Sequence, residues 1–581
     1  MGTERSSQQN ALDQTNVEIT DNFTMQVDDF LFTLGTSNQF YSFDNLFIQD
    51  YYGYYEFSSI DNFKSGTWSR YRNSYLTNSS LYEKSAAWGM SQHAFYAQAD
   101  WSVMPGLKVY GGVRAEVSLF PDQPYKNNLF DSLFSSQNYK TEEVPNGMFL
   151  LSPRIGFNWD VFKDKKTQLR GGAGLFTGRT PGVWLSNQYS NTGVDFARTS
   201  LTKYDTLYKF SVNPDLQPKA AGAATTSIAF TDPNFKMPSI WKLNLGFDQE
   251  LEDGIILTAE ILYQKTQNDV LFKNINLKDS ALNSQGRYMF YQTQATKQYV
   301  PGAILMTNTD QGSQIFATIQ LQKLYGQGSL PGLSANISYT WSQVKDVNSA
   351  TSSVAYSNWS FNYADNPNNA KLTLSNFDTP HRVMANLGYT FDYLDGFSTT
   401  IGMYFEYRSG QPFTFVYSSA ADVNFDGVRG NDIAFIPSTE GQLEFTTKGA
   451  NYADFVSFIN QFDGIDDQKG KIMERNSLRA PATSQLDLRI AQEIPIIKGH
   501  KFEITADVFN LPNLINSEYG WYKYVPFNNY TLLVHEGYNA TGQEIVTFNK
   551  PTTLEDGKPV IWTKDQFLSR WRMQLGVRYT F

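Results

Sequence analysis

The segment WRMQLGVRYTF, residues 571–581, decides the fold that this sequence predicts. Apolar side chains occupy every second position in it, and arginine, glutamine, glycine and threonine occupy the positions between them. Successive side chains of a β-strand point to opposite faces of the sheet, so this pattern predicts a strand with one apolar face and one polar face. A soluble sandwich could contain one such strand. The same pattern, however, recurs at a similar length along the whole chain.

The alternating segments come in pairs that short turns connect. One pair runs through residues 95–103 and 107–117, and another runs through residues 241–247 and 257–263, with glycine in both connecting turns. We count about fifteen long strands of this kind along the sequence. Long polar and aromatic stretches separate the pairs, and we expect loops near residues 49–86, 121–148, 179–238, 266–312, 346–379, 409–481 and 512–566.

Two regularities favour a membrane barrel over a soluble β-array. Short turns alternate with long loops, as in transmembrane barrels, which have short periplasmic turns and long extracellular loops. The face opposite the apolar wall carries more charges than a dry core could hold. We therefore predict an all-β, antiparallel transmembrane barrel with a wide polar lumen. The charges that indicate this lumen are Arg114, Glu116, Arg154, Asp160, Lys242, Asp248, Glu260, Glu406, Asp487, Arg489, Glu503 and Asp507.

The composition agrees with this interpretation. The 581 residues include 41 Gly, 35 Tyr, 43 Phe and 11 Trp, yet the mean hydropathy is -0.41, which suits strands that are apolar on one face. No apolar run is long enough to predict a transmembrane helix, although barrel strands escape such a search. The net charge of -10 argues against a nucleic-acid partner. The absence of cysteine excludes disulfides and thiol catalysis.

Several motifs resemble those of TonB-dependent outer-membrane receptors of the Oar-like type, found in Bacteroidetes-like bacteria. The resemblance implies a barrel of 22 strands in the outer membrane, plugged by an N-terminal domain. Counted back from Phe581, the strands of this chain would be the last fifteen, so we expect residues 1–581 to be an N-terminally truncated barrel. An odd strand count supports this expectation, because single-chain bacterial barrels have an even number. The motifs are GTSNQFYSFDNLFI (35–48), LSPRIGFNWD (151–160), QLRGGAGLFTGRTPGVWLSNQ (168–188), YRSGQPF (407–413), NDIAFIP (431–437), QLDLRIAQEIP and FEITADVFNLPNLIN (within 485–516), and GVRYTF (576–581).

The resemblance also implies a function and partners. A receptor of this kind imports a large nutrient, such as a peptide, a glycan or a metal chelate, and the TonB complex would act through an N-terminal region that has no match here. The alternative is an outer-membrane surface or adhesion protein without active transport. Expected partners are outer-membrane lipid, a surface lipoprotein, and the outer-membrane assembly machinery, which would read Tyr579 and Phe581 in the terminal strand.

No catalytic motif is present, so we predict that the protein is not an enzyme and assign no catalytic or cofactor-binding residues. The sequence contains no Gly-x-Ser-x-Gly elbow, no Walker loop and no His-Glu-x-x-His motif. Its four histidines, His93, His381, His500 and His535, lack the spacing of a metal site, and only His93 lies near a predicted outer rim.

One constellation predicts a metal. Residues 422–427 read DVNFDG and are followed by Asn431 and Asp432. Oxygen ligands at alternate positions, with glycine at the sixth, match the start of a calcium loop, although Ile433 replaces the glutamate at the twelfth position. The alternative is an exposed turn rich in Asp, Asn and Gly. The candidate calcium ligands are Asp422, Asn424, Asp426, the carbonyl oxygen of Val428, and Asp432.

Overall fold

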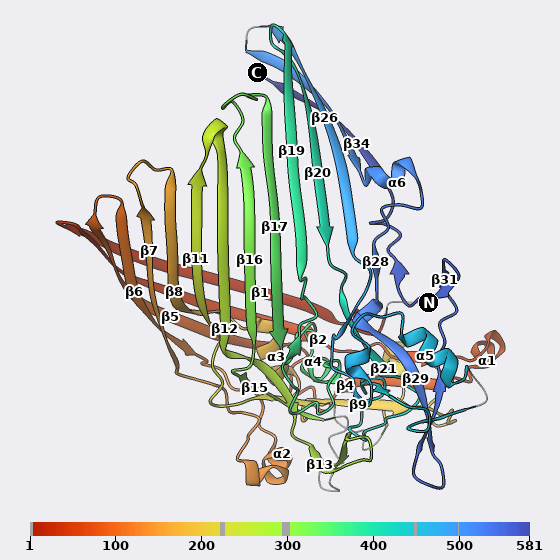
Figure 1. Cartoon of the computed structure of the whole chain (residues 1–581). Coiled ribbons are helices and arrows are strands. Elements are labelled where there is room, and N and C mark those ends of the chain that lie inside the picture. Colours follow the sequence, from red (N-terminus) through yellow and green to blue (C-terminus); the bar gives the residue numbers. More distant parts are fainter. Residues whose placement is uncertain (1–3, 221–226, 293–301, 447–449, 498) are drawn as a thin grey trace.

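The computed structural model describes residues 4–220, 227–292, 302–446, 450–497 and 499–581. Its centre is one curved sheet of 18 strands (Figure 1). Three of them, β10 (Ile228–Thr231), β15 (Ala303–Thr309) and β18 (Thr373–Leu374), are short additions at one end. The other strands confirm the predicted antiparallel architecture, because each pairs antiparallel with the next. They are β1 (Asn10–Val27), β2 (Phe30–Phe47), β5 (Ala86–Met104), β6 (Leu107–Leu119), β7 (Met148–Asp160), β8 (Thr167–Thr177), β11 (Ser239–Glu250), β12 (Ile255–Asn274), β16 (Ser313–Lys323), β17 (Leu333–Asp346), β19 (His381–Leu394), β20 (Phe397–Arg408), β26 (Thr483–Ile497), β27 (His500–Phe509) and β34 (Arg572–Thr580).

The register separates charged from apolar side chains across the sheet. Arg489 of β26 lies opposite Asp507 of β27, and the neighbouring Leu488 lies opposite Val508. Residues that are directly opposite in adjacent strands share a face. Arg489 forms ion pairs with Asp507 at 3.2 Å and with Glu503 at 3.6 Å. One face of the sheet is therefore polar, and the other is apolar.

Further ion pairs continue this polar face across other strands. Arg170 of β8 contacts Asp248 of β11 at 3.0 Å and Glu260 of β12 at 2.7 Å. Arg382 of β19 contacts Glu406 of β20 at 2.8 Å. Charged groups arranged in this way need water or polar protein around them, because a dry apolar interior would not repay their desolvation. The polar face is therefore the lumen side of the wall.

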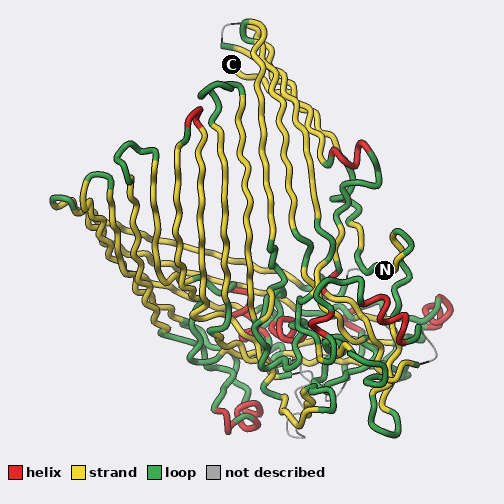
Figure 2. Tube along the Cα trace, viewed as in Figure 1, coloured by secondary structure: helices red, strands yellow, loops and turns green. Residues whose placement is uncertain are grey.

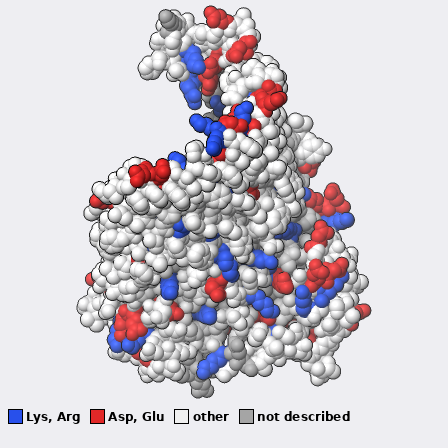
Figure 3. All heavy atoms as spheres, turned by 60° about the vertical axis from the view of Figure 1, so that its left-hand side comes forward, with Lys and Arg blue, Asp and Glu red and all other residues white. Residues whose placement is uncertain are grey.

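The apolar face has the exposure expected of a lipid-facing wall. Phe95, Leu575 and Val577 are 65%, 74% and 73% exposed. Exposure this high is unusual for large apolar side chains that form a patch on a water-soluble protein. On the side shown in Figure 3, a broad surface below the projection at the top is largely uncharged, and charged residues gather on that projection and over the lower half. So many exposed large apolar side chains are typical of a surface that contacts hydrocarbon.

The two ends of the barrel wall differ. Short turns join the long strands at one end, and long connections gather at the other (Figure 2). These connections comprise residues 48–85, 120–147, 178–238, 275–312, 347–380, 409–482 and 510–571. Parts of three predicted loops, residues 221–226, 293–301 and 447–449, lie outside the described residues.

Two predicted loop boundaries need correction. The loop expected from residue 266 begins after Asn274, because β12 continues past the apolar wall and pairs there with β15. The last loop, expected to end at residue 566, continues to Trp571. At the first boundary the strand extends beyond the membrane, where it no longer needs an apolar face. At the second, the apolar residues Phe567, Leu568 and Trp571 resemble the start of the terminal strand although they precede it.

The last two long connections fold together into a cap with its own sheet. Its strand order is β23 (Glu444–Phe445), β30 (Glu544–Phe548), β29 (Asn529–Tyr538), β21 (Pro412–Tyr417) and β25 (Leu478–Arg479). Strand β21 runs parallel to β29, and β23 runs parallel to β30. Helix α5 (Tyr452–Ile459) packs on this sheet, and a capping box between Asn451 and Asp454 fixes the start of the helix.

A second apolar cluster fills the mouth of the barrel. Helix α3 (Gly182–Ser190) packs on the lumen side of β2 and β5, where Trp88 stacks between Phe43, at 4.4 Å, and Tyr189, at 4.9 Å. Helix α4 (Ala355–Ser360) contributes Trp359 to the same cluster. The long connections that contain these helices are therefore folded over the mouth.

In the described parts of the chain, no helix is long and apolar enough to cross a membrane.

The wall assignment predicts opposite responses at adjacent positions of β11. Leu245 points to lipid near the middle of its strand, whereas Asn244 lies on the lumen side between Lys242 and Asp248. Leu245→Arg should lower the free energy of unfolding by about 2–4 kcal/mol, because it places a charge in hydrocarbon. Asn244→Arg is the matched control and should cost much less. Urea unfolding in phospholipid vesicles measures both, and equal losses would contradict the assignment.

The cap predicts a local effect of a core substitution. Phe415 is fully buried and touches Phe458, Phe462 and Tyr530. Phe415→Ala should destabilise the cap by about 3–5 kcal/mol, since it removes a buried ring and leaves a cavity. Hydrogen exchange should rise in residues 409–482 and 510–571 but not in the wall. Phe527→Ala, at a position that is 88% exposed, is the control and should change neither region. Faster exchange throughout the wall would argue against a separate core.

Candidate functional site

The residues predicted to bind calcium lie in the cap, directly after β21. We name residues 422–432 the Asp-rich loop. The chain returns to β21 at the end of this loop, where the Tyr417 amide donates to the Asp432 carbonyl at 2.8 Å and the Ala434 amide donates to the Phe415 carbonyl at 2.9 Å. The loop is therefore closed at its base by strand-like hydrogen bonds.

Three residues with positive φ shape the turn of the Asp-rich loop. Phe425, Gly427 and Gly430 have φ angles of 64°, 91° and 82°. Glycine adopts such angles without the steric cost that a side chain brings. Gly427 is the sixth residue of the motif, so it permits the sharp turn that the calcium-loop pattern predicts at this position.

The structure brings the predicted side chains together and buries most of them. Asn424, Asp426 and Asp432 are 1%, 0% and 1% exposed, and Asp422 is half-buried. The turn is thus exposed only in part, at Phe425, Gly427 and Arg429. Burial arises because Val423 and Ile433 of the same segment belong to the cap core and draw the neighbouring polar residues inward.

Asp426 is the centre of the hydrogen bonds within the loop. Its Oδ2 accepts from the side-chain amides of Asn431, at 3.0 Å, and Asn424, at 3.4 Å, and its Oδ1 accepts from the Val428 amide at 2.7 Å. The Gly427 amide donates to Asp422 Oδ2 at 2.9 Å. The loop thus folds around one buried carboxylate.

Burial makes the ionised form of these carboxyls costly. Desolvation raises the pKa of Asp426 to about 6, and repulsion from Asp422 adds to this effect. Desolvation also raises the pKa of Asp432 to about 7, although Arg287 opposes the shift. The pKa of Asp422 is raised as well, again mainly by burial. Burial therefore disfavours the negative charge of all three carboxyls.

Arg287 is the buried cation beside the loop, and no pattern in the sequence predicted it. Its Nη1 lies 3.8 Å from Asp432 Oδ1, its Nη2 donates to the Ile433 carbonyl at 2.7 Å, and its guanidinium lies 5.1 Å from the centre of the Tyr417 ring. Arg287 follows β13 (Leu277–Leu282), far from the loop in the sequence. Asn431, which directly precedes Asp432, was not among the predicted ligands either, although its side chain contacts Asp426.

Several oxygens of the loop have no hydrogen bond. Asp422 Oδ1, Asn431 Oδ1 and Asp432 Oδ1 are buried, and none of them has a hydrogen-bond partner in the described structure. Within the described ranges, no group of three or more His, Cys, Asp or Glu side chains is arranged to hold a metal ion. A cation here would therefore need the amide and carbonyl oxygens of the loop in addition to its carboxylates.

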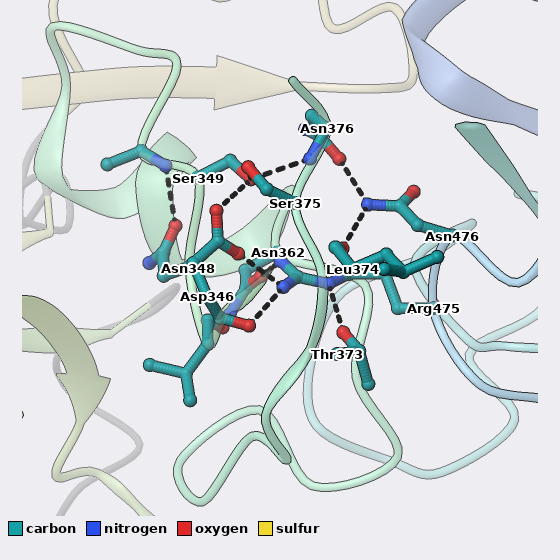
Figure 4. A network of polar contacts seen from close by, with 12 residues as sticks. Asp346, Asn348, Ser349, Asn362, Thr373, Leu374, Ser375, Asn376, Arg475 and Asn476 are labelled. Atoms are coloured by element: carbon teal, nitrogen blue, oxygen red, sulfur yellow. Dashed lines mark hydrogen bonds and ion pairs between the residues drawn. The ribbon is translucent and has the colours of Figure 1, made fainter. Parts of the chain in front are cut away.

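A second buried network ties the base of the cap to the barrel wall (Figure 4). Arg475 is 5% exposed, and its guanidinium donates to Asp346 at the end of β17 at 2.5 Å, to Asn362 at 2.7 Å and to Thr373 at 3.0 Å. The adjacent Asn476 donates to Asn376 Oδ1 at 2.8 Å. The adjacent side chains of Arg475 and Asn476 thus join their own connection to wall strand β17 and to the connection of residues 347–380.

Each of the four histidines forms a polar side-chain contact. His93 lies on the lipid side of the wall, with Nδ1 2.8 Å from Asn38 Oδ1 and Nε2 3.2 Å from Ser91 Oγ. A serine, a histidine and an amide in this order can form a nucleophilic relay. β5 pairs with β2 and β6 at these positions, however, so its amides are engaged in the sheet and none remains to stabilise an oxyanion. His381, His500 and His535 contact Tyr339, Tyr579 and Glu544.

The fold and the folded mouth define a class of protein. An antiparallel wall with one lipid-facing side, one charged lumen side and all its long connections at one end is a β-barrel of the bacterial outer membrane. The family model described as "outer membrane beta barrel domain" matches residues 1–519. The chain belongs to this family.

Similar solved structures have low sequence identity to the chain. The outer membrane transporter YddB from Escherichia coli is 10% identical, with a TM-score of 0.46, and 98% of this chain covers 54% of that protein. The iron transporter FrpB from Neisseria meningitidis is 11% identical, with a TM-score of 0.44, and the match covers 87% of this chain and 52% of that protein. BauA, the ferric preacinetobactin receptor from Acinetobacter baumannii, is 10% identical, with a TM-score of 0.43, and the match covers 98% of this chain and 54% of that protein. The chain spans about half the length of these structures. No curated protein matches it.

The Arg475 network predicts a strong effect of a single substitution. Arg475→Gln removes a buried cation and leaves Asp346 with an unpaired charge, which should cost about 3–5 kcal/mol. Proteolysis should then occur faster in residues 347–380 and 471–476. Lys471→Gln, which removes an exposed cation from the same segment, is the control and should leave the proteolysis rate unchanged. Equal rates for the two variants would show that the network does not hold the connections.

Proposed function

We propose that the protein forms part of an outer-membrane transporter that imports a large nutrient. The observation that carries this proposal is the charged lumen face, where Arg170 bridges Asp248 and Glu260. A barrel with such a wall surrounds water or a polar plug rather than an apolar core. The connections folded over its mouth give the outer end a shaped surface, as expected of a receptor that selects a ligand before uptake.

The resemblance to Oar-like TonB-dependent receptors supports a finer proposal. The cargo is a peptide, a glycan or a metal chelate, and import is driven by the TonB complex through an N-terminal plug domain. Further proposed partners are a surface lipoprotein and the assembly machinery that recognises the terminal strand, where Phe581 is 88% exposed. We also propose that the protein is not an enzyme, since the amides around His93 are engaged in the sheet.

A second candidate function is adhesion without active transport. It is favoured by exposed aromatic side chains on the cap, among them Tyr519, which is 59% exposed, and Phe527, which is 88% exposed. Aromatic side chains of this kind bind sugars and proteins at low entropic cost. The cap could therefore serve a partner on another surface.

Uptake by living cells separates the two functions. Cells that carry the intact gene, a gene deletion or a TonB deletion are given fluorescent oligopeptides, oligosaccharides and ferric chelates. The transport proposal expects both deletions to abolish uptake of one of these classes. Normal uptake of all three classes in the gene deletion, together with lost attachment to a surface, would replace the proposal with adhesion.

A further inference from the structure

We propose that the Asp-rich loop binds a calcium ion through a mixed set of oxygens, contributed by Asp422, Asp426, Asp432 and the side chain of Asn431 together with amide and carbonyl oxygens of the loop, because in the described residues the carboxylates alone do not form a cluster that could hold a metal. The proposal concerns a metal site in the cap and does not depend on what the barrel transports. Asn424 and the Val428 carbonyl complete the set of oxygen donors, as the motif predicts.

The first support is the set of oxygens without hydrogen bonds. Asn431 and Asp432 are 4% and 1% exposed, and each has one side-chain oxygen without a hydrogen bond. The remaining Asp422 oxygen is in the same state. Asn431 reaches the centre of the loop with its amide nitrogen, because its Nδ2 lies 3.0 Å from Asp426 Oδ2, and the unbonded Oδ1 is the other end of the same amide. Buried polar atoms normally have partners. Three oxygens without one in a single loop therefore indicate a missing partner that binds oxygen, such as a cation.

The second support is the charge of the site. Asp422, Asp426 and Asp432 share one loop, and the buried cation beside them, Arg287, lies 3.8 Å from Asp432 alone. The exposed Arg429 is the other cation that favours ionisation of Asp422. A divalent ion among the three carboxylates would neutralise the charge that Arg287 leaves unbalanced.

The donor chemistry selects calcium over magnesium. All the donors are oxygens, which both ions accept, but magnesium requires octahedral geometry and usually keeps several water molecules. The loop buries Asn424, Asp426 and Asp432 almost completely, so an ion among them would be shielded from bulk water. Calcium accepts six to eight oxygens in irregular geometry. Half a turn of the Asn431 amide exchanges its nitrogen for its oxygen at constant volume, and this rotation would present Oδ1 to the ion.

The position of the loop gives the ion a structural role. The Asn424 carbonyl accepts from the Phe290 amide at 2.8 Å, and Arg287 donates to the Ile433 carbonyl at 2.7 Å. Both contacts join the Asp-rich loop to the connection between β12 and β16. Calcium would therefore fasten two long connections to each other at the mouth, and its removal would loosen both.

Calorimetry on the full-length protein in detergent, with calcium chloride as titrant, tests the site. We expect a dissociation constant on the order of 10⁻⁴–10⁻³ M, because the motif lacks its final glutamate. Asp426→Asn should weaken binding at least about tenfold, since the affinity of a calcium site depends on the number of its charged ligands. Asp463→Asn, which removes an exposed carboxylate from the same connection, is the matched control and should bind like the wild type.

A second variant separates a lost ligand from a misfolded loop. Asn431→Asp supplies a carboxylate oxygen at the proposed ligand and should bind calcium at least as tightly as the wild type, whereas Asn431→Leu should not bind. No heat of binding at about 10 mM calcium would overturn the proposal, because even weak extracellular loops bind there. Unchanged binding in Asp426→Asn, or equal affinity for magnesium, would overturn it as well. None of these outcomes depends on uptake, so failure here leaves the proposed transport function unaffected.

Discussion

The structure depends on one constraint, which is that backbone amides and carbonyls cannot remain unpaired in hydrocarbon. A membrane-spanning wall of strands satisfies this requirement through hydrogen bonds between neighbouring strands. Each residue is then fixed to one face, and the side-chain pattern acquires its period of two. The contrast between Leu488 and Arg489, adjacent in β26, follows directly. In the described residues β1 pairs with β2 alone and β34 with β27 alone, so both edges need partners before they can face lipid.

The wall could be predicted from the sequence because its rule is local. Alternation identifies a strand from a few residues, and the paired turns then give the order of strands. The cap follows no such rule. Strand β21 is buried on both sides along its whole length, and it pairs in parallel with β29, a segment far away in the sequence. No local period marks either property, so these residues looked like polar or aromatic loop.

The candidate site was predicted in the same partial way. Glycine spacing and alternating oxygens within residues 422–427 are a local pattern, and the structure brings these side chains together. Arg287 could not be found, because it reaches Asp432 through tertiary folding alone. Nothing in the spacing reveals burial either, since the depth of Asp426 results from the core packing of Val423 and Ile433. Sequence patterns therefore predicted which side chains meet in the loop but not their electrostatic surroundings.

The cap also constrains the order in which the molecule can fold. Its sheet forms when residues after β20 meet residues after β27, so the wall strands between these segments must first bring the two connections together. Contacts between distant parts of a chain form slowly, because a long loop has to close before any interaction rewards it. Newly inserted barrels should thus pass through a stage with a finished wall and an unfinished mouth. During that stage the apolar side chains of the cap core remain open to the surroundings of the cell, and this interval is when the protein is most exposed to proteases and to aggregation.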